Sequence, residues 1–152
     1  MLKIHNPATG ESIAEVPQAT PEIVAERARA ARQAQPAWFA GGIDARLQVL
    51  QRFRVALAAE LEPLAATLTQ EVGKPIRQSR NEINGLLGRI DFFLTQAAAT
   101  LAPQQVFDEG GTREVIGFDP LGVVANISAW NYPYFVGGNA PNLLNNLYNV
   151  HN

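Results

Sequence analysis

The residue best suited to chemistry is Asn131, which follows the most regular apolar run in the sequence. The run, LGVVANI over 121–127, comes after the turn residues Asp119 and Pro120 and has the length of a strand buried on both faces. Pro133 suits the first turn of a following helix, because its missing N–H would be unpaired there. The predicted unit is therefore a strand, a tight turn and a helix start. Open α/β sheets bind ligands just beyond the carboxyl end of such a strand.

The side chain of Asn131 has two interpretations at this position. Its amide offers an uncharged N–H₂ donor, and a donor fixed at the end of a rigid strand stabilises an oxyanion that forms only during reaction. Asn is equally favoured as a helix cap and as a turn residue. Spacing alone favours the cap or turn, so a catalytic role needs further support.

The elements that must position this segment begin with a hairpin and a helix. Residues 1–17 alternate around a turn and predict a short β-hairpin or two edge strands. Thr20 as N-cap and Pro21 at the first helical position predict a helix running to about Gln35. The aromatic and glycine-containing stretch 36–42, which begins with a proline, predicts a loop.

Three further helices are expected before residue 102. The first starts near Asp44, and the second runs from Pro63 to Val72, with Gly73 as a left-handed cap. The third covers 76–101, where apolar residues recur every three, four or seven positions. Residues 20–101 are therefore expected to be almost all helix, with no catalytic constellation of their own.

A β-ribbon is predicted next. Residues 112–118 have strand character, and Gly110–Gly111 suits a hairpin turn to 105–107. Such an amphipathic ribbon needs a partner to cover it. The resulting division of the chain is a hairpin and helical part (1–103), a ribbon (104–119), a first strand and helix start (120–139), and an Asn-rich tail (140–152).

Three motifs give the chain a specific resemblance. PLGVV at 120–124, followed by ISAWNYP at 127–133, resembles the P-x-G-V…W-N-[FY]-P segment of the NAD(P)-dependent aldehyde dehydrogenase superfamily. NPATGE at 6–11 resembles that family's N-terminal motif, and EVGKP at 71–75 resembles its E-x-G-K-P turn. The resemblance covers about residues 1–139 and then fades in a tail where six of the last fourteen residues are Asn.

The resemblance implies the N-terminal part of an α/β, aldehyde-dehydrogenase-like fold: a helix-rich segment, an oligomerisation β-ribbon and the start of a Rossmann-like cofactor domain. By motif, Asn131 matches the family's oxyanion-hole Asn. The strand end that lines the nicotinamide–ribose side of an NAD or NADP site matches Ile127, Ser128, Ala129 and Trp130. The substrate would be a small aldehyde, and subunits would pair through the 112–118 strand.

The composition of the chain narrows the classes of function and partner that remain open. The net charge is −2 with acids and bases interspersed, which disfavours nucleic acid or an anionic membrane as a partner. The chain has no cysteine, so it contains neither a thiolate metal site nor a thiol nucleophile. His5 has no second ligand at metal-binding spacing. Without an apolar run near 18 residues or a signal-peptide pattern, we expect a cytoplasmic protein without membrane spans.

Two functions are compatible with these observations. In the first, the sequence is the N-terminal part of a working aldehyde dehydrogenase, which oxidises an aldehyde to a carboxylic acid through a Cys thiohemiacetal. Because the Cys nucleophile and the Glu base lie beyond residue 139 in that family, this chain alone is expected to be inactive. In the second, the chain is a non-catalytic truncated homologue that acts as an oligomerisation or interaction fragment.

Overall fold

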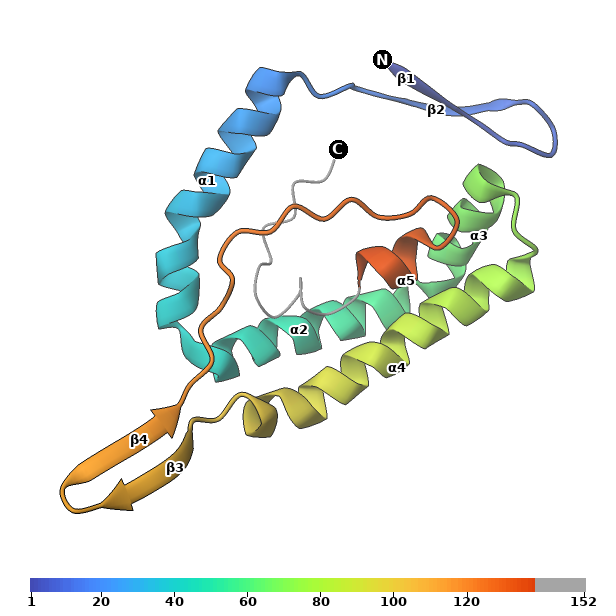
Figure 1. Ribbon diagram of the computed structural model, residues 1–152. Helices are drawn as coiled ribbons and strands as arrows, with labels where there is room; N and C mark the ends of the chain where they lie inside the picture. The colour runs from blue at the N-terminus through green and yellow to red at the C-terminus, as the bar shows by residue number, and fades with distance from the viewer. Residues whose placement is uncertain (139–152) are drawn as a thin grey trace.

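A computed structural model of the chain describes residues 1–138 (Figure 1). Its elements, in chain order, are β1 (Leu2–His5), β2 (Ser12–Val16), α1 (Pro21–Ala40), α2 (Gly42–Ala59), α3 (Leu61–Val72), α4 (Ile76–Thr100), β3 (Gln104–Glu109), β4 (Thr112–Ile116) and α5 (Pro133–Gly137). In the described part of the chain, the strands form two separate antiparallel pairs, β1 with β2 and β3 with β4.

The N-terminal hairpin forms as predicted. Leu2 faces Val16 and Ile4 faces Ala14 across the pair. At its tip, the carboxamide of Asn6 accepts a hydrogen bond of 2.9 Å from the backbone N–H of Ala8, a local bond that favours turns at Asn. The tip is therefore held by its own residues.

Helix α1 begins as the sequence predicts and ends later. The hydroxyl of Thr20 accepts from the N–H of Ile23 at 3.4 Å, and Pro21 occupies the first turn. The predicted loop at 36–42 is wrong, because Pro36 lies inside the helix, which continues to Ala40. Proline removes one helical hydrogen bond, yet the helix continues for a further turn, in which the Trp38 side chain is half-buried.

The core lies between α2, α3 and α4. It is made of aliphatic side chains from these three helices: Leu50, Leu57, Ala65, Ile83, Leu86, Leu87, Ile90 and Ala97. Tyr134 and Phe135 of α5 pack against it. Gly85 gives the Phe135 ring room, because a Cβ at Gly85 would lie 3.4 Å from that ring. Helix α5 therefore rests directly on α4, as Figure 1 shows.

The helix boundaries follow local chemistry only in part. Gly73 ends α3 in the left-handed conformation, with φ of 76°, as predicted. Helix α2 starts at Gly42, behind Gly41, two residues before the predicted start near Asp44. Pro63 is the third residue of α3, since that helix already begins at Leu61.

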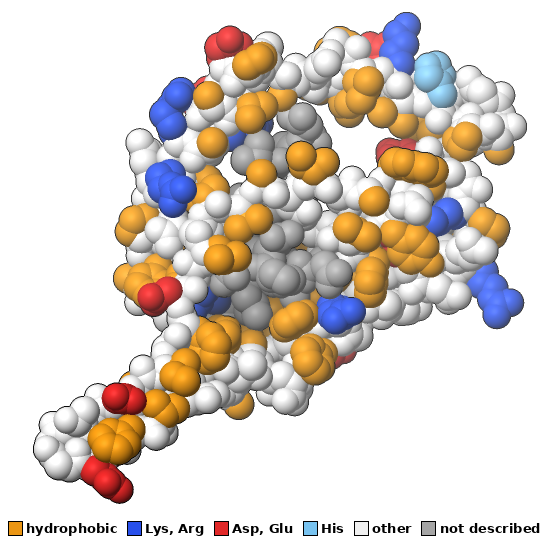
Figure 2. Space-filling view, in the orientation of Figure 1, with side chains coloured by type: hydrophobic (Ala, Val, Ile, Leu, Met, Phe, Trp, Pro, Cys, Tyr) orange, Lys and Arg blue, Asp and Glu red, His pale blue; other side chains and the backbone are white. Residues whose placement is uncertain are grey.

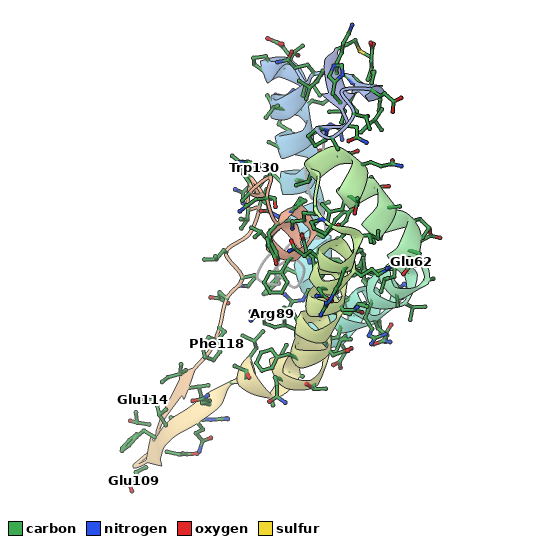
Figure 3. All side chains as sticks on the ribbon, turned by 90° about the vertical axis from the view of Figure 1, so that its right-hand side faces the viewer. Glu62, Arg89, Glu109, Glu114, Phe118 and Trp130 are labelled. Atoms are coloured by element: carbon green, nitrogen blue, oxygen red, sulfur yellow. The ribbon has the colours of Figure 1, made fainter. Side chains whose placement is uncertain are left out.

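Strands β3 and β4 form the predicted ribbon, which projects from the helical body (Figures 1 and 3). Gly110 and Gly111 both have positive φ, 59° and 83°, as a two-residue hairpin turn of the right twist requires. The register shifts between Gln105 and Phe107. All residues of both strands are exposed.

The predicted buried strand at 121–127 does not form. After β4 the chain runs back across the molecule as an irregular segment to α5 (Figure 1). Leu121 and Ile127 are 81% and 94% exposed. A strand buried on both faces needs a neighbour on each edge and cover on each face, and within residues 1–138 no strand lies beside this segment to pair with it.

Candidate functional site

The turn that carries Asn131 is closed by its own backbone and tied to α5. The N–H of Tyr132 donates to the carbonyl of Ala129 at 3.3 Å. The hydroxyl of Ser128 donates to the carbonyl of Pro133 at 3.0 Å. On the approach to the turn, Nδ2 of Asn126 donates to the carbonyl of Gly137 at 2.8 Å. These bonds attach both sides of the turn to the short helix.

Asn131 itself sits in the turn with an exposed side chain. The N-cap of α5 is Tyr132, whose side chain makes no capping hydrogen bond to the helix. Asn131 therefore lies in the turn and does not cap α5, so the helix-cap interpretation is wrong. The uncharged donor is not used to hold the helix end, and its catalytic role remains a proposal.

The N-terminus of α5 is instead bound by Glu82 of α4. One carboxylate oxygen accepts from the N–H of Tyr134 at 2.9 Å and from the N–H of Phe135 at 3.2 Å. The other oxygen pairs with the Lys74 ammonium. That ammonium lies 3.6 Å from the centroid of the Tyr132 ring. The Glu82 side chain is fully buried, and its charge is met by a cation and by two backbone donors.

Sequence reasoning missed Glu82 and used Lys74 only as part of a motif. A signal was present, because Glu82 precedes Ile83 on the apolar side of a periodic helix. Acidic side chains are almost never fully buried unless they are paired. A lone acid within an apolar stripe therefore predicts a buried partner, although the stripe does not identify it.

Tyr134 fixes the other side of α5. Its hydroxyl donates to the carbonyl of Leu64 at 3.3 Å. Burial of the ring raises the pKa of Tyr134, and the negative charges of Glu71 and Glu82 raise it further. The phenol therefore stays neutral and keeps its donor well above neutral pH.

The residues matched to the cofactor wall share one exposed stretch. Ile127, Ser128, Ala129 and Trp130 are all exposed, and Trp130 is 80% exposed and lies at the edge of the body in Figure 3. Ser128 is occupied by its bond to Pro133. The structure brings these residues beside Asn131 in one turn and leaves their apolar surface uncovered among the described residues.

Two clefts open elsewhere on the described surface. One, of about 350 Å³, lies over Gly85, Gly88, Arg89, Phe92 and Phe135. The other, of about 400 Å³, lies where Phe118, Asp119 and Pro120 pass the end of α4. Neither is lined by Asn131.

Residues 1–138 contain no group of three or more His, Asp or Glu side chains arranged to hold a metal ion. No helix among those residues is long and apolar enough to cross a membrane.

The three sequence motifs meet in space. A Cβ placed on Gly73 would lie 2.9 Å from the Pro7 ring, so the hairpin tip touches the α3–α4 turn. Lys74, from the same turn, lies on the ring of Tyr132. Segments that are far apart in the chain thus converge on the Asn131 turn.

A comparison with protein families decides the relationship. The model of the aldehyde dehydrogenase family matches residues 1–142. The chain belongs to the aldehyde dehydrogenase family. Both the resemblance seen in the three motifs and the predicted fold class are confirmed.

Comparisons with individual proteins of the family support the same relationship. The chain is 35% identical over 135 residues to a 3,6-anhydro-alpha-L-galactose dehydrogenase of Streptomyces coelicolor, covering 87% of this chain and 27% of that protein. It superposes on a succinate-semialdehyde dehydrogenase of Burkholderia pseudomallei with a TM-score of 0.86 at 28% identity, covering 95% of this chain and 30% of that one.

A third relative holds a cofactor. An NADP-dependent glyceraldehyde-3-phosphate dehydrogenase of Bacillus halodurans, complexed with NADP, has the same fold with a TM-score of 0.85 at 24% identity, covering 95% of this chain and 32% of that one. The chain thus spans roughly a quarter to a third of the length of the aldehyde dehydrogenases it matches.

Proposed function

We propose that this chain supplies the oxyanion donor and part of the nicotinamide wall of an NAD- or NADP-dependent aldehyde dehydrogenase. The observation that carries the proposal is the Asn131 turn. An uncharged N–H₂ donor stands exposed on a turn bonded to α5 on both sides, while the helix N-terminus is bound by Glu82.

The role proposed for Asn131 follows from its chemistry. When a thiolate attacks an aldehyde, the carbonyl oxygen becomes an oxyanion, and an amide N–H in place beforehand stabilises it more than it stabilises the neutral carbonyl. One such donor is typically worth about 3–4 kcal/mol. The chain has no cysteine, so the thiolate would come from sequence outside it, and by the family resemblance so would the Glu that activates water.

The residues at 127–130 fit the uncharged face of a nicotinamide nucleotide. They carry no charge, and Ile127 and Trp130 expose apolar surface at 94% and 80%, which marks a surface that something covers. When bound, the nicotinamide accepts a hydride from the substrate. The part of this chain would be to present the apolar wall and to hold Asn131 next to it.

The ribbon favours self-association as a second property. Its exposed apolar side chains are Val106, Phe107, Val115, Ile116 and, just beyond it, Phe118, and Figure 2 shows apolar side chains along the projecting arm. A second copy of the chain could pair with this edge. The same observation supports the alternative of a non-catalytic truncated homologue that acts only in association. For the whole protein we propose a cytoplasmic location.

The test is to assay this chain beside a longer protein that joins it to the Cys- and Glu-bearing part of a relative. Short aldehydes would be supplied with NAD or NADP, and reduced cofactor followed by absorbance. The proposal predicts turnover by the longer protein and none by the 152-residue chain. Turnover by the short chain alone, or an inactive but folded and cofactor-binding longer protein, would contradict it.

A further inference from the structure

One buried ion pair lies beneath the Asn131 turn. Among the four ion pairs found in the described residues, the side chains of the other three are 32–65% exposed, whereas those of Lys74 and Glu82 are 12% and 0% exposed. Removing two charges from water is costly, and well-packed apolar residues often serve stability as well or better. A buried pair at this position therefore suggests a role in specifying geometry.

The contacts of the pair are with the residues that directly follow Asn131. Glu82 binds the N–H groups of Tyr134 and Phe135, which are orphan donors of the first turn of α5. Lys74 holds the ring of Tyr132, the next residue after Asn131, through a cation–π contact of 3.6 Å. The two charges thus fix the residues that come after Asn131, through both backbone and side chain.

The pair also joins the turn to the core. Glu82 lies beside the fully buried Ile83 on α4, and Lys74 follows the left-handed cap Gly73. The side chain of Ser79, also fully buried, is within 2.9 Å of the Thr69 hydroxyl and ties α4 to α3 beneath the pair. The pair therefore lies next to the packed contact between α3 and α4.

We propose that Glu82 and Lys74 are positioning residues that set the direction of the Asn131 amide. This inference rests on the proposed function of Asn131. It adds that the donor is aligned by a charged pair on α4 and on the α3–α4 turn, neither of which touches the substrate.

The first experiment uses the 152-residue chain and does not depend on activity. Glu82→Gln removes the charge and keeps the size of the side chain. We expect amide hydrogen exchange at Tyr134 and Phe135 to rise at least about tenfold, since the bonds to a charged acceptor are the stronger ones. The NMR order parameter of the Asn131 side-chain amide should fall as well.

The matched control is Glu62→Gln, which breaks the exposed Glu62–Arg80 pair between α3 and α4. Glu62 lies on the opposite side of the helical body from Trp130 in Figure 3, so neither quantity should change. A second variant, Tyr132→Leu, alters a ring that is 45% exposed and keeps the test decisive if Glu82→Gln does not fold. It should also lower the order of the Asn131 amide. An unchanged Asn131 amide in the folded variants would overturn the inference.

The second experiment places Glu82→Gln in the longer active protein. A misaligned donor should lower kcat per active site by about ten- to a hundredfold with little change in aldehyde KM. A purely structural role would reduce the amount of folded enzyme and leave kcat per titrated site unchanged, which would contradict the inference. If the unmodified longer protein were inactive, the proposed function would fail, while the NMR result would still decide whether the pair orders the turn.

Discussion

The two asparagines of the segment before α5, Asn126 and Asn131, have different structural roles. Asn126 donates to the carbonyl of Gly137 and ties the incoming chain to α5. Asn131, five residues later, is exposed and does not cap that helix. Residue type alone does not separate these roles. The two roles can be told apart only in the structure, where Glu82 rather than Asn131 accepts hydrogen bonds from the N–H groups at the start of α5.

Asp91 offers a test of electrostatics at a single residue. Arg54 donates two hydrogen bonds, of 2.7 and 2.9 Å, to its carboxylate. Those bonds, with the charge of Arg54, lower the pKa of Asp91 below its usual 3.8. A lowered folded-state pKa gives stability that is complete above the unfolded value and disappears as the pH falls through the folded value.

We therefore expect Asp91→Asn to lower the melting temperature modestly at neutral pH, and this loss to shrink as the pH falls below 3.8 and through the lowered folded-state pKa. Circular dichroism melts across that range would measure the difference. The double variant with Arg54→Met should melt like the single Arg54→Met variant. A difference from wild type that persists undiminished in acid would contradict the assignment to this ion pair.

At the scale of elements, the best-predicted parts are those whose signal is local. The 3.6-residue period of apolar residues predicts the bounds of α4 almost to the residue. The glycines at 73, 110 and 111 predict a helix cap and a hairpin turn, because both structures require residues with positive φ. The prediction of a loop at Pro36 is wrong because proline removes only one helical hydrogen bond, a local penalty that α1 tolerates.

The parts that could not be predicted depend on distant partners. The run 121–127 has the composition of a buried strand, but strand formation requires neighbouring strands that residues 1–138 do not place beside it. The Glu82–Lys74 pair joins a turn and a helix to the segment around Tyr132. Periodicity shows that an acid lies on the apolar face, and only the tertiary structure shows what it binds.

The contact between the hairpin and the α3–α4 turn can be tested with two glycines. Gly73 and Gly42 both have positive φ, 76° and 74°. Alanine in the left-handed region costs about 1–2 kcal/mol at either site. At Gly73 the new Cβ would also lie 2.9 Å from the Pro7 ring, whereas at Gly42 it meets open space.

Gly73→Ala should therefore reduce the free energy of unfolding by more than Gly42→Ala does, because the hairpin must move away. Urea unfolding of the two variants measures this difference. Equal losses would show that the hairpin tip does not rest on the α3–α4 turn.

At the scale of the whole molecule, two parts of the described surface expose large apolar side chains. The ribbon is exposed along its full length, and the segment 121–130 exposes Leu121, Ile127 and Trp130 at 80% or more. Large exposed apolar side chains gathered in one region mark interaction surfaces. We propose that a second copy of the chain covers the first and that the cofactor contacts the second.

If the chain self-associates through the ribbon, substitutions on β4 should lower its molecular mass in solution. Val115 and Ile116 are 47% and 50% exposed on β4, and replacing both with Glu would place charges on the pairing edge. Light scattering after size exclusion should show an oligomer for the unmodified chain and a monomer for the double variant. Thr112→Glu, next to the turn, is the control and should remain an oligomer. A monomeric unmodified chain would contradict this assignment.

The most direct test compares Asn131→Ala with Asn126→Ala in the longer, active protein. The account predicts that Asn131→Ala lowers kcat by about a hundred- to a thousandfold while the melting temperature stays near that of the parent. Asn126→Ala, which removes the bond to Gly137, should mainly lower the melting temperature. If Asn131→Ala instead lowered the melting temperature and left kcat per folded enzyme intact, Asn131 would be a structural turn residue and the central claim would be wrong.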